Sequence, residues 1–208
     1  MSGPLRQQRP KPGNVVVGIL RVARGRADGV AQFGGTREAF LASLAPLIAF
    51  PLVGGVLMIV GGGGLEALTD LLATLCALLA PPVLSFQAAR WWGRETEWLR
   101  FATAFNWCQW IIPILLSLLL LVFGSLAMAG LPPDLARNGV LICLITYGLW
   151  LHCFLARHSL GLSWPRAGLM VIGVNLATVL LVAGPRGLLV YGPRVLALLT
   201  QGTGLPSK

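Results

Sequence analysis

The sequence contains few charged residues, and lysine is nearly absent. Aspartate, glutamate, lysine and arginine make up 11% of the 208 residues, whereas 56% are hydrophobic and the mean hydropathy is +0.78. Soluble domains have about 25% charged and roughly 45–50% apolar residues, so this composition excludes an ordinary soluble domain and indicates a membrane protein. Lys11 and Lys208 are the only lysines. No lysine therefore lies in an apolar stretch to carry a Schiff base.

The sequence also lacks the usual motifs of metal, haem and nucleotide sites. CxxC, CxxCH and HExxH do not occur, and Leu65 and Glu66 follow the glycines at 61–64 where a P-loop requires Lys and Ser or Thr. No serine, cysteine or aspartate has an obvious base for nucleophilic catalysis. We therefore expect no enzymatic activity, no cofactor and no metal site. The cysteines lie in apolar stretches, and we expect them to be reduced and buried: Cys76, Cys108, Cys143 and Cys153.

Five stretches are long and apolar enough to cross a membrane, which takes roughly 20 residues for a hydrocarbon core of about 30 Å. They lie at 39–60, 65–86, 101–127, 139–156 and 167–183. In lipid, backbone polar groups must be satisfied within the segment, which favours helices. Strands of a barrel would be shorter and would alternate in polarity. The sequence thus predicts an all-α fold, a polytopic membrane bundle of five transmembrane helices over residues 39–185.

The segments on either side of this bundle are predicted to lie outside the hydrocarbon core. Residues 1–14 form a basic, Pro-containing tail that we expect to be disordered and that has no cleavable signal. Within the cytoplasmic segment 15–38, apolar residues recur at helical spacing over 15–33, which predicts one basic amphipathic helix on the membrane surface. Residues 186–208 are predicted to form an interfacial helix, interrupted at Gly192 and Pro193, and a tail. A sixth span over 186–201 is the alternative.

The distribution of Lys and Arg predicts the orientation of the chain. When these residues are counted by loop, twelve of the sixteen lie on the side of the N-terminus. Because cytoplasmic loops carry the excess of Lys and Arg, the N-terminus is predicted inside and the C-terminus outside.

One cytoplasmic turn holds most of the tryptophan. Five of the seven tryptophans lie between positions 91 and 110. Tryptophan rings favour the headgroup region, and arginines there are attracted to anionic lipid. We therefore expect lipid anchors at Trp91, Trp92, Trp98, Arg90, Arg94 and Arg100.

Two acids lie inside a predicted span, near its outer end. Glu66 and Asp70 are four residues apart and so share one helix face. A functional interpretation makes them a proton or cation site in which repulsion between the two carboxylates raises one pKa. The alternative is that acids stabilise the beginning of a helix through its dipole, and we favour this second interpretation.

Four further polar residues are predicted to lie in one layer, roughly 7–12 Å below the cytoplasmic surface at helical rise. They are Asn106, Gln109, His152 and Asn175. One hypothesis is a ligand or ion site in this layer, gated by Arg157. The other, which we favour, is that these side chains form hydrogen bonds between helices, each worth about 0.6–2 kcal/mol.

Three stretches resemble a known family. They are GGTREAFLASLAPLIAFPL before and within the first span, FATAFNWCQWIIP at the third and WLHCFLARHSLGLS at the end of the fourth. Together with the five-span layout, they resemble the Yip domain family and related uncharacterised alphaproteobacterial membrane proteins, over about residues 15–185. The resemblance implies a membrane protein without catalytic residues.

These observations predict a scaffold, assembly factor or accessory subunit of a complex in a bacterial inner membrane, because the Arg-biased, Gly- and Ala-rich composition fits a GC-rich bacterial genome. A small transporter or channel component that uses the polar layer is the alternative. The expected partners are the anionic inner leaflet and other membrane subunits or a second copy of the chain. The net charge of +9 is spread between apolar stretches, so we expect no nucleic-acid partner.

Overall fold

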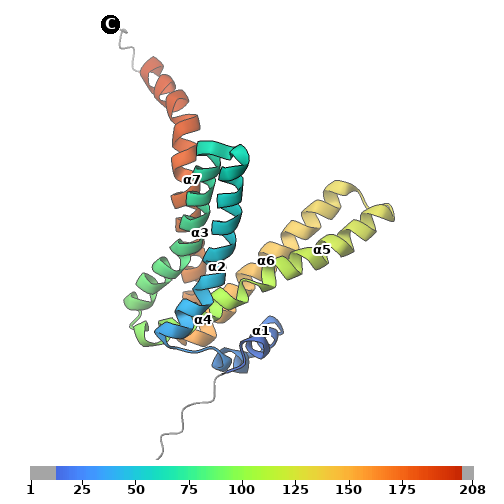
Figure 1. Cartoon of the computed structure of the whole chain (residues 1–208), viewed down its shortest axis with the longest axis vertical. Coiled ribbons are helices and arrows are strands. Elements are labelled where there is room, and N and C mark those ends of the chain that lie inside the picture. The colour runs from blue at the N-terminus through green and yellow to red at the C-terminus, as the bar shows by residue number, and fades with distance from the viewer. Residues whose placement is uncertain (1–12, 203–208) are drawn as a thin grey trace, which may run out of the picture. The chain divides into compact units, whose positions relative to one another are not determined.

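The fold is helical throughout the part of the chain that the structure describes. The computed structural model describes the backbone of residues 13–202 and the side chains of residues 13–183. Within these residues no strand occurs, which confirms the predicted all-α class. The elements are α1 (Val15–Ala23), η1 (Ala27–Gln32), α2 (Arg37–Met58), η2 (Ile59–Gly63), α3 (Gly64–Trp91), α4 (Glu95–Cys108), α5 (Ile111–Met128), α6 (Pro133–Leu160) and α7 (Trp164–Gly202) (Figure 1).

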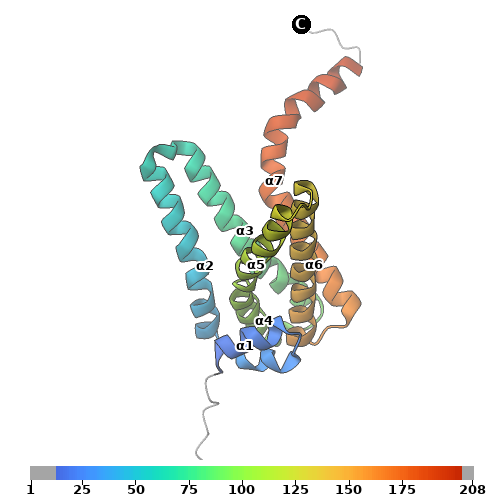
Figure 2. The same ribbon diagram turned by 90° about the vertical axis from the view of Figure 1, so that its right-hand side faces the viewer.

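Four helices in the described residues are long and apolar enough to cross a membrane. They are Arg37–Trp91, Glu95–Met128, Pro133–Leu160 and Trp164–Ala183. The first of them has 55 residues and contains both α2 and α3, which form a hairpin through the turn η2 (Figure 2). Gly62 in this turn has a φ of 98°, in the left-handed region that glycine adopts without a steric penalty. These helices are consistent with a membrane protein.

The predicted third span, 101–127, consists of two helices instead of one. Helix α4 ends at Cys108, and α5 begins at Ile111. Pro113 accounts for the break, because it has no N–H to donate to the carbonyl of Gln109 and its ring clashes with that carbonyl. The turn tightens there: the amide of Trp110 donates to the carbonyl of Trp107 over 3.3 Å.

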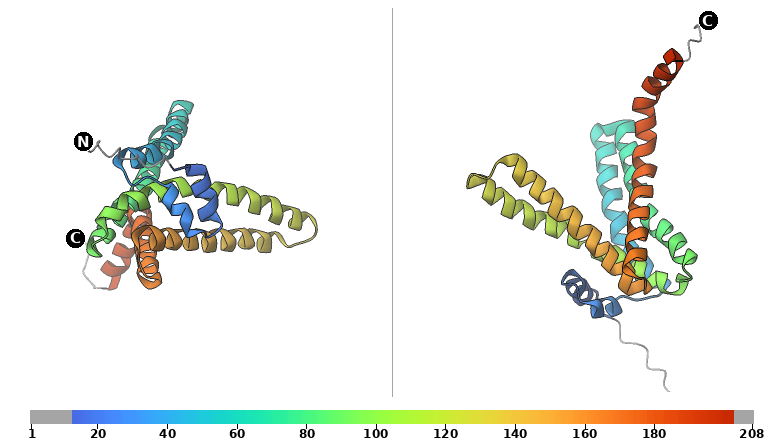
Figure 3. Two further views of the ribbon diagram at one scale, coloured as in Figure 1. Left: turned by 90° about the horizontal axis from the view of Figure 1, so that it is seen from below. Right: turned by 180° about the vertical axis from the view of Figure 1, so that it is seen from behind.

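The described residues divide into two compact units. One contains the positions up to Ala45 and Gly93–Ala167, and the other contains Pro46–Trp92 and the positions from Gly168 onward. In the first unit, α5 and α6 lie side by side as an antiparallel hairpin (Figures 1 and 3).

The core of the first unit lies where α1, η1 and α4 pack against the C-terminal half of α6. The largest side chains buried there are Val22, Phe33, Phe101, Leu151, Leu155 and Leu160, all at most 3% exposed. The hydroxyl of Tyr147 on α6 donates a hydrogen bond to the carbonyl of Ala23, 3.0 Å away, at the end of α1. This bond fixes the N-terminal segment against α6.

The N-terminal segment 15–33 differs from the single amphipathic helix predicted for it. Helix α1 ends at Ala23, and Gly25, with a φ of 73°, reverses the chain so that η1 folds back on α1. Val16 and Leu20 of the predicted apolar face are exposed, whereas Val22 is fully buried. The helical spacing of apolar residues did not predict the reversal at Gly25, because one glycine in a left-handed conformation changes the direction of all residues after it.

An ion-pair cluster closes this N-terminal hairpin. Arg26 donates hydrogen bonds to the Asp28 carboxylate over 3.0 and 3.2 Å, and Arg21 of α1 donates over 3.0 Å. The hydrogen bond from Arg26, followed by the charges of both arginines, holds the pKa of Asp28 below its ordinary value. The carboxylate is therefore ionised at neutral pH and links η1 to α1.

Two further predictions differ from the structure. Helix α7 runs from Trp164 to Gly202 without a boundary at residue 186, and the interfacial position of 186–208 stays a prediction. A proline can bend a helix without ending it. Cys76 and Cys143 are exposed, although we expected buried thiols. All four cysteines are free, as predicted.

Candidate functional site

Asn106 forms a hydrogen bond between two helices in which both side chains are buried. Its amide Nδ2 donates to the hydroxyl of Ser43, 3.0 Å away, and Ser43 in turn donates to the carbonyl of Phe40 over 2.6 Å. Asn106 is 1% exposed and Ser43 0%. A buried amide without a partner costs about 1–3 kcal/mol, so this bond stabilises the fold without any ligand. It joins the first half of α2 to α4.

The other members of the predicted polar layer are not joined to Asn106 by hydrogen bonds within the described residues. The His152 ring packs on Phe105 with ring centroids 4.7 Å apart. Gln109 is half-buried at the end of α4, where its backbone amide donates to the carbonyl of Phe105. Asn175 lies in the other compact unit, is exposed, and donates to the carbonyl of Val171 in its own helix over 2.7 Å.

Arg157, the predicted gate of that layer, has a different neighbour. Its guanidinium lies over the ring of Trp164, 5.0 Å from the ring centre. This is cation–π geometry, and it joins the end of α6 to the first residue of α7.

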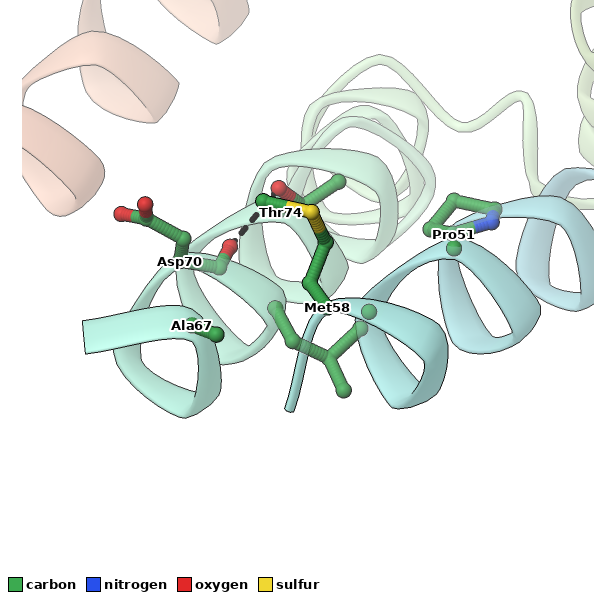
Figure 4. Close-up of a pocket in the computed structure, with 8 residues that line it drawn as sticks. Pro51, Met58, Ala67, Asp70 and Thr74 are labelled. Atoms are coloured by element: carbon green, nitrogen blue, oxygen red, sulfur yellow. Dashed lines mark hydrogen bonds between the residues drawn. The ribbon is translucent and has the colours of Figure 1, made fainter. Parts of the chain in front are cut away.

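The two acids near the predicted outer surface lie on the first turns of α3, as the sequence indicates. Glu66 is in the first turn, where the helix dipole stabilises an acid, and is exposed. Asp70 is at the edge of a groove of about 220 Å³ between α2 and α3. Figure 4 shows its carboxylate directed away from Met58 and Pro51. Across the residues with described side chains, no group of three His, Cys, Asp or Glu could hold a metal ion.

The predicted lipid anchors fall into two groups. Trp91 is 76% exposed, and the three arginines Arg90, Arg94 and Arg100 are exposed as well. Trp98 instead packs against Phe40 of α2, with ring centroids 5.4 Å apart, and Trp92 is half-buried. Lipid contact by Trp91 and the arginines stays a prediction, whereas Trp98 contributes to the packing of the first unit.

Two features were missed from the sequence. The partner of Asn106, Ser43, lies 63 residues earlier, and its only sequence signal is that a serine interrupts an apolar stretch. A second groove, of about 390 Å³, lies between α3 and α7 and is lined almost entirely by apolar side chains. Apolar residues facing a groove have no sequence signal that distinguishes them from those facing lipid.

The long apolar helices, the exposed apolar faces and the composition are consistent with a polytopic helical membrane protein. No protein-family model, no curated protein and no solved structure matches this chain. The likeness to the Yip domain family stays a prediction that depends on the three stretches quoted above.

Proposed function

We propose that this chain is a non-catalytic scaffold, assembly factor or accessory subunit of a bacterial inner-membrane complex, with a Yip-like layout. The observation that carries the proposal is the apolar surface that its own fold leaves uncovered. In the helices Arg37–Trp91 and Glu95–Met128, none of the most hydrophobic 18-residue window is buried. The most exposed large side chains include Val60, Leu65, Ile114 and Leu121, at 80, 78, 69 and 68%.

Exposed glycines favour a protein neighbour over lipid on these faces. A Cβ added at Gly54 of α2 or at Gly124 of α5 would meet no atom within 4 Å. Glycine inside a helix costs about 1 kcal/mol relative to alanine, and nothing in the chain's own packing requires it at these positions. Small residues on membrane helices allow a second helix to approach closely. The uncovered faces of α2 and α5 are therefore proposed to contact other subunits or a second copy of the chain.

Five crossings with the N-terminus inside are part of the same proposal. Helices α2 and α3 have 22 and 28 residues, so each is long enough to span the membrane separately. With α4 and α5 together as a third span, and α6 and α7 as the fourth and fifth, the loops alternate so that most arginines are cytoplasmic.

The alternative, a small transporter or channel component, has less support. Asn106 is already satisfied by Ser43, and Asn175 is bonded within its own helix. Neither hydrogen bond requires a ligand. The bond of Asn106 fits the interpretation of the polar residues as hydrogen bonds between helices, whereas that of Asn175 lies within one helix.

The topology is tested by the side from which single cysteines react, in a background without the four native cysteines. We expect Gly62→Cys, in the turn between α2 and α3, to react with a membrane-impermeant maleimide added to intact cells. Glu95→Cys, at the beginning of α4, should react only after the membrane is opened. Reaction of both from the same side would contradict the five-span arrangement.

The scaffold proposal is tested by photo-crosslinking in native membranes. A photo-reactive residue is placed at Val53 on α2 or at Leu121 on α5, which are 61% and 68% exposed. We expect at least one to give a discrete covalent adduct with another protein or with a second copy of the chain. The matched control at Leu155, which is fully buried, should give no intermolecular adduct. If both exposed positions react with lipid alone, the proposal is wrong.

A further inference from the structure

The groove between α3 and α7 is lined almost entirely by apolar side chains, and both of its walls belong to the second compact unit. We call it the α3–α7 groove. Leu84, Trp91 and Trp92 contribute from α3, and Met170, Gly173 and Ala177 from α7. Gln87 is the one lining residue with an amide side chain. The interior can therefore accept hydrocarbon, and its few polar groups come from the C-terminal end of α3.

A positive charge lies beside the end of the groove that carries the two tryptophans, and it favours an anionic ligand. Arg90 lies in the last turn of α3, three residues after Gln87 and next to Trp91, and is exposed. Residues three apart share a helix face, so Arg90 lies on the face of α3 that carries Gln87, beside the polar end of the groove. Tryptophan is favoured at headgroup depth, and arginine there attracts anionic headgroups.

The size of the groove also limits what can fill it. Its volume of about 390 Å³ is that of a small-ligand pocket, for which about 300–1,000 Å³ is usual. A groove of this size can hold a segment of one flexible hydrocarbon chain.

Gly173 keeps the middle of the groove open. A Cβ built at this position meets no atom within 4 Å, so the space above it is free of the chain's own atoms. We propose that the α3–α7 groove binds one acyl chain of an anionic phospholipid, whose headgroup is held at Arg90. This lipid is a specific ligand, unlike the annular lipid that contacts every exposed face.

The test measures lipid retained by the purified full-length chain, using native mass spectrometry after titration with phosphatidylglycerol or phosphatidylcholine. Wild type should retain one phosphatidylglycerol in preference to phosphatidylcholine. Gly173→Leu fills the groove and should weaken phosphatidylglycerol retention about tenfold, which corresponds to about 1.4 kcal/mol. Gly168→Leu is the matched control, because Gly168 is also in α7, also has no atom within 4 Å of an added Cβ, and does not line the groove. It should retain lipid as wild type does.

The Arg90→Gln variant tests the contribution of the headgroup separately from that of the acyl chain. It should remove the preference for phosphatidylglycerol and leave phosphatidylcholine retention unchanged. Equal retention by Gly173→Leu and Gly168→Leu would overturn the proposal, as would equal retention of the two lipids by wild type. Since both leucine variants raise helix propensity by similar amounts, a difference between them reports on the groove. The result is independent of whether a protein adduct forms at Val53 or Leu121.

Discussion

Replacing Leu155 by alanine is expected to lower the free energy of unfolding by about 2–5 kcal/mol. Leu155 is fully buried in the C-terminal half of α6, in the core that α6 forms with α1, η1 and α4. Replacing its isobutyl side chain by a methyl group leaves a cavity among neighbours that are themselves buried, such as Leu151. The loss is measured by reversible unfolding in mixed micelles, with the SDS fraction as the denaturing variable.

Leu141→Ala on the same helix is the control for this prediction. Leu141 is 48% exposed, and truncating a side chain that faces lipid in both the folded and unfolded states should change stability by about 0.5 kcal/mol or less. Both variants remove the same atoms from the same helix. Equal losses for the two would contradict the assignment of the core to the C-terminal half of α6.

The membrane class and the helices could be predicted because they depend on local composition. An apolar stretch of about 20 residues forms a helix in lipid whatever its neighbours are, since its backbone groups have no other partners. Breaks within an apolar stretch were harder to predict from the sequence. Pro113 divides the third stretch, whereas Pro46 and Pro51 remain inside α2. The identity of one residue does not reveal whether a proline ends a helix or stays inside it.

The site was predicted less well than the fold, because its contacts join distant parts of the chain. Asn106 was recognised as a polar residue in a span, but its partner Ser43 could not be, since any polar group on a neighbouring helix would have served. Asn175 was placed in the same layer by helical rise, yet its amide is bonded to Val171 within α7. The depth of a residue in the membrane can be predicted by counting residues along its helix. The neighbours of its side chain depend on how the helix is rotated about its axis, which this count does not give.

The N-terminal hairpin shows how the core and the predicted surface segment are linked. Val22 of α1 is fully buried, and Phe33, just after η1, is 2% exposed. The segment contributes side chains to the core of the first unit, and its position on the membrane surface stays a prediction. Its contact with α6 through Tyr147 therefore makes it part of the folded domain.

Replacing Gly29 by valine should separate η1 from α1. A Cβ at Gly29 would lie 2.7 Å from Cβ of Arg21, 2.9 Å from the backbone nitrogen of Val22 and 3.0 Å from the carbonyl oxygen of Gly18. Two of these are backbone atoms of α1, which no side-chain rotation can move away. Because the hairpin buries Val22 and Val30, we expect a local loss of about 3 kcal/mol or more, at about 1.5–3 kcal/mol for each large apolar side chain.

Hydrogen exchange of the amides in segment 15–33 measures this loss. Their protection should fall by about a hundredfold or more in Gly29→Val, since each 1.4 kcal/mol corresponds to a factor of ten. The hairpin of α5 and α6 should keep its protection, which shows that the chain is still folded. Gly54→Val is the control, because a Cβ at Gly54 meets no atom within 4 Å. If the segment stays protected in Gly29→Val, the close approach of η1 to α1 does not hold the hairpin.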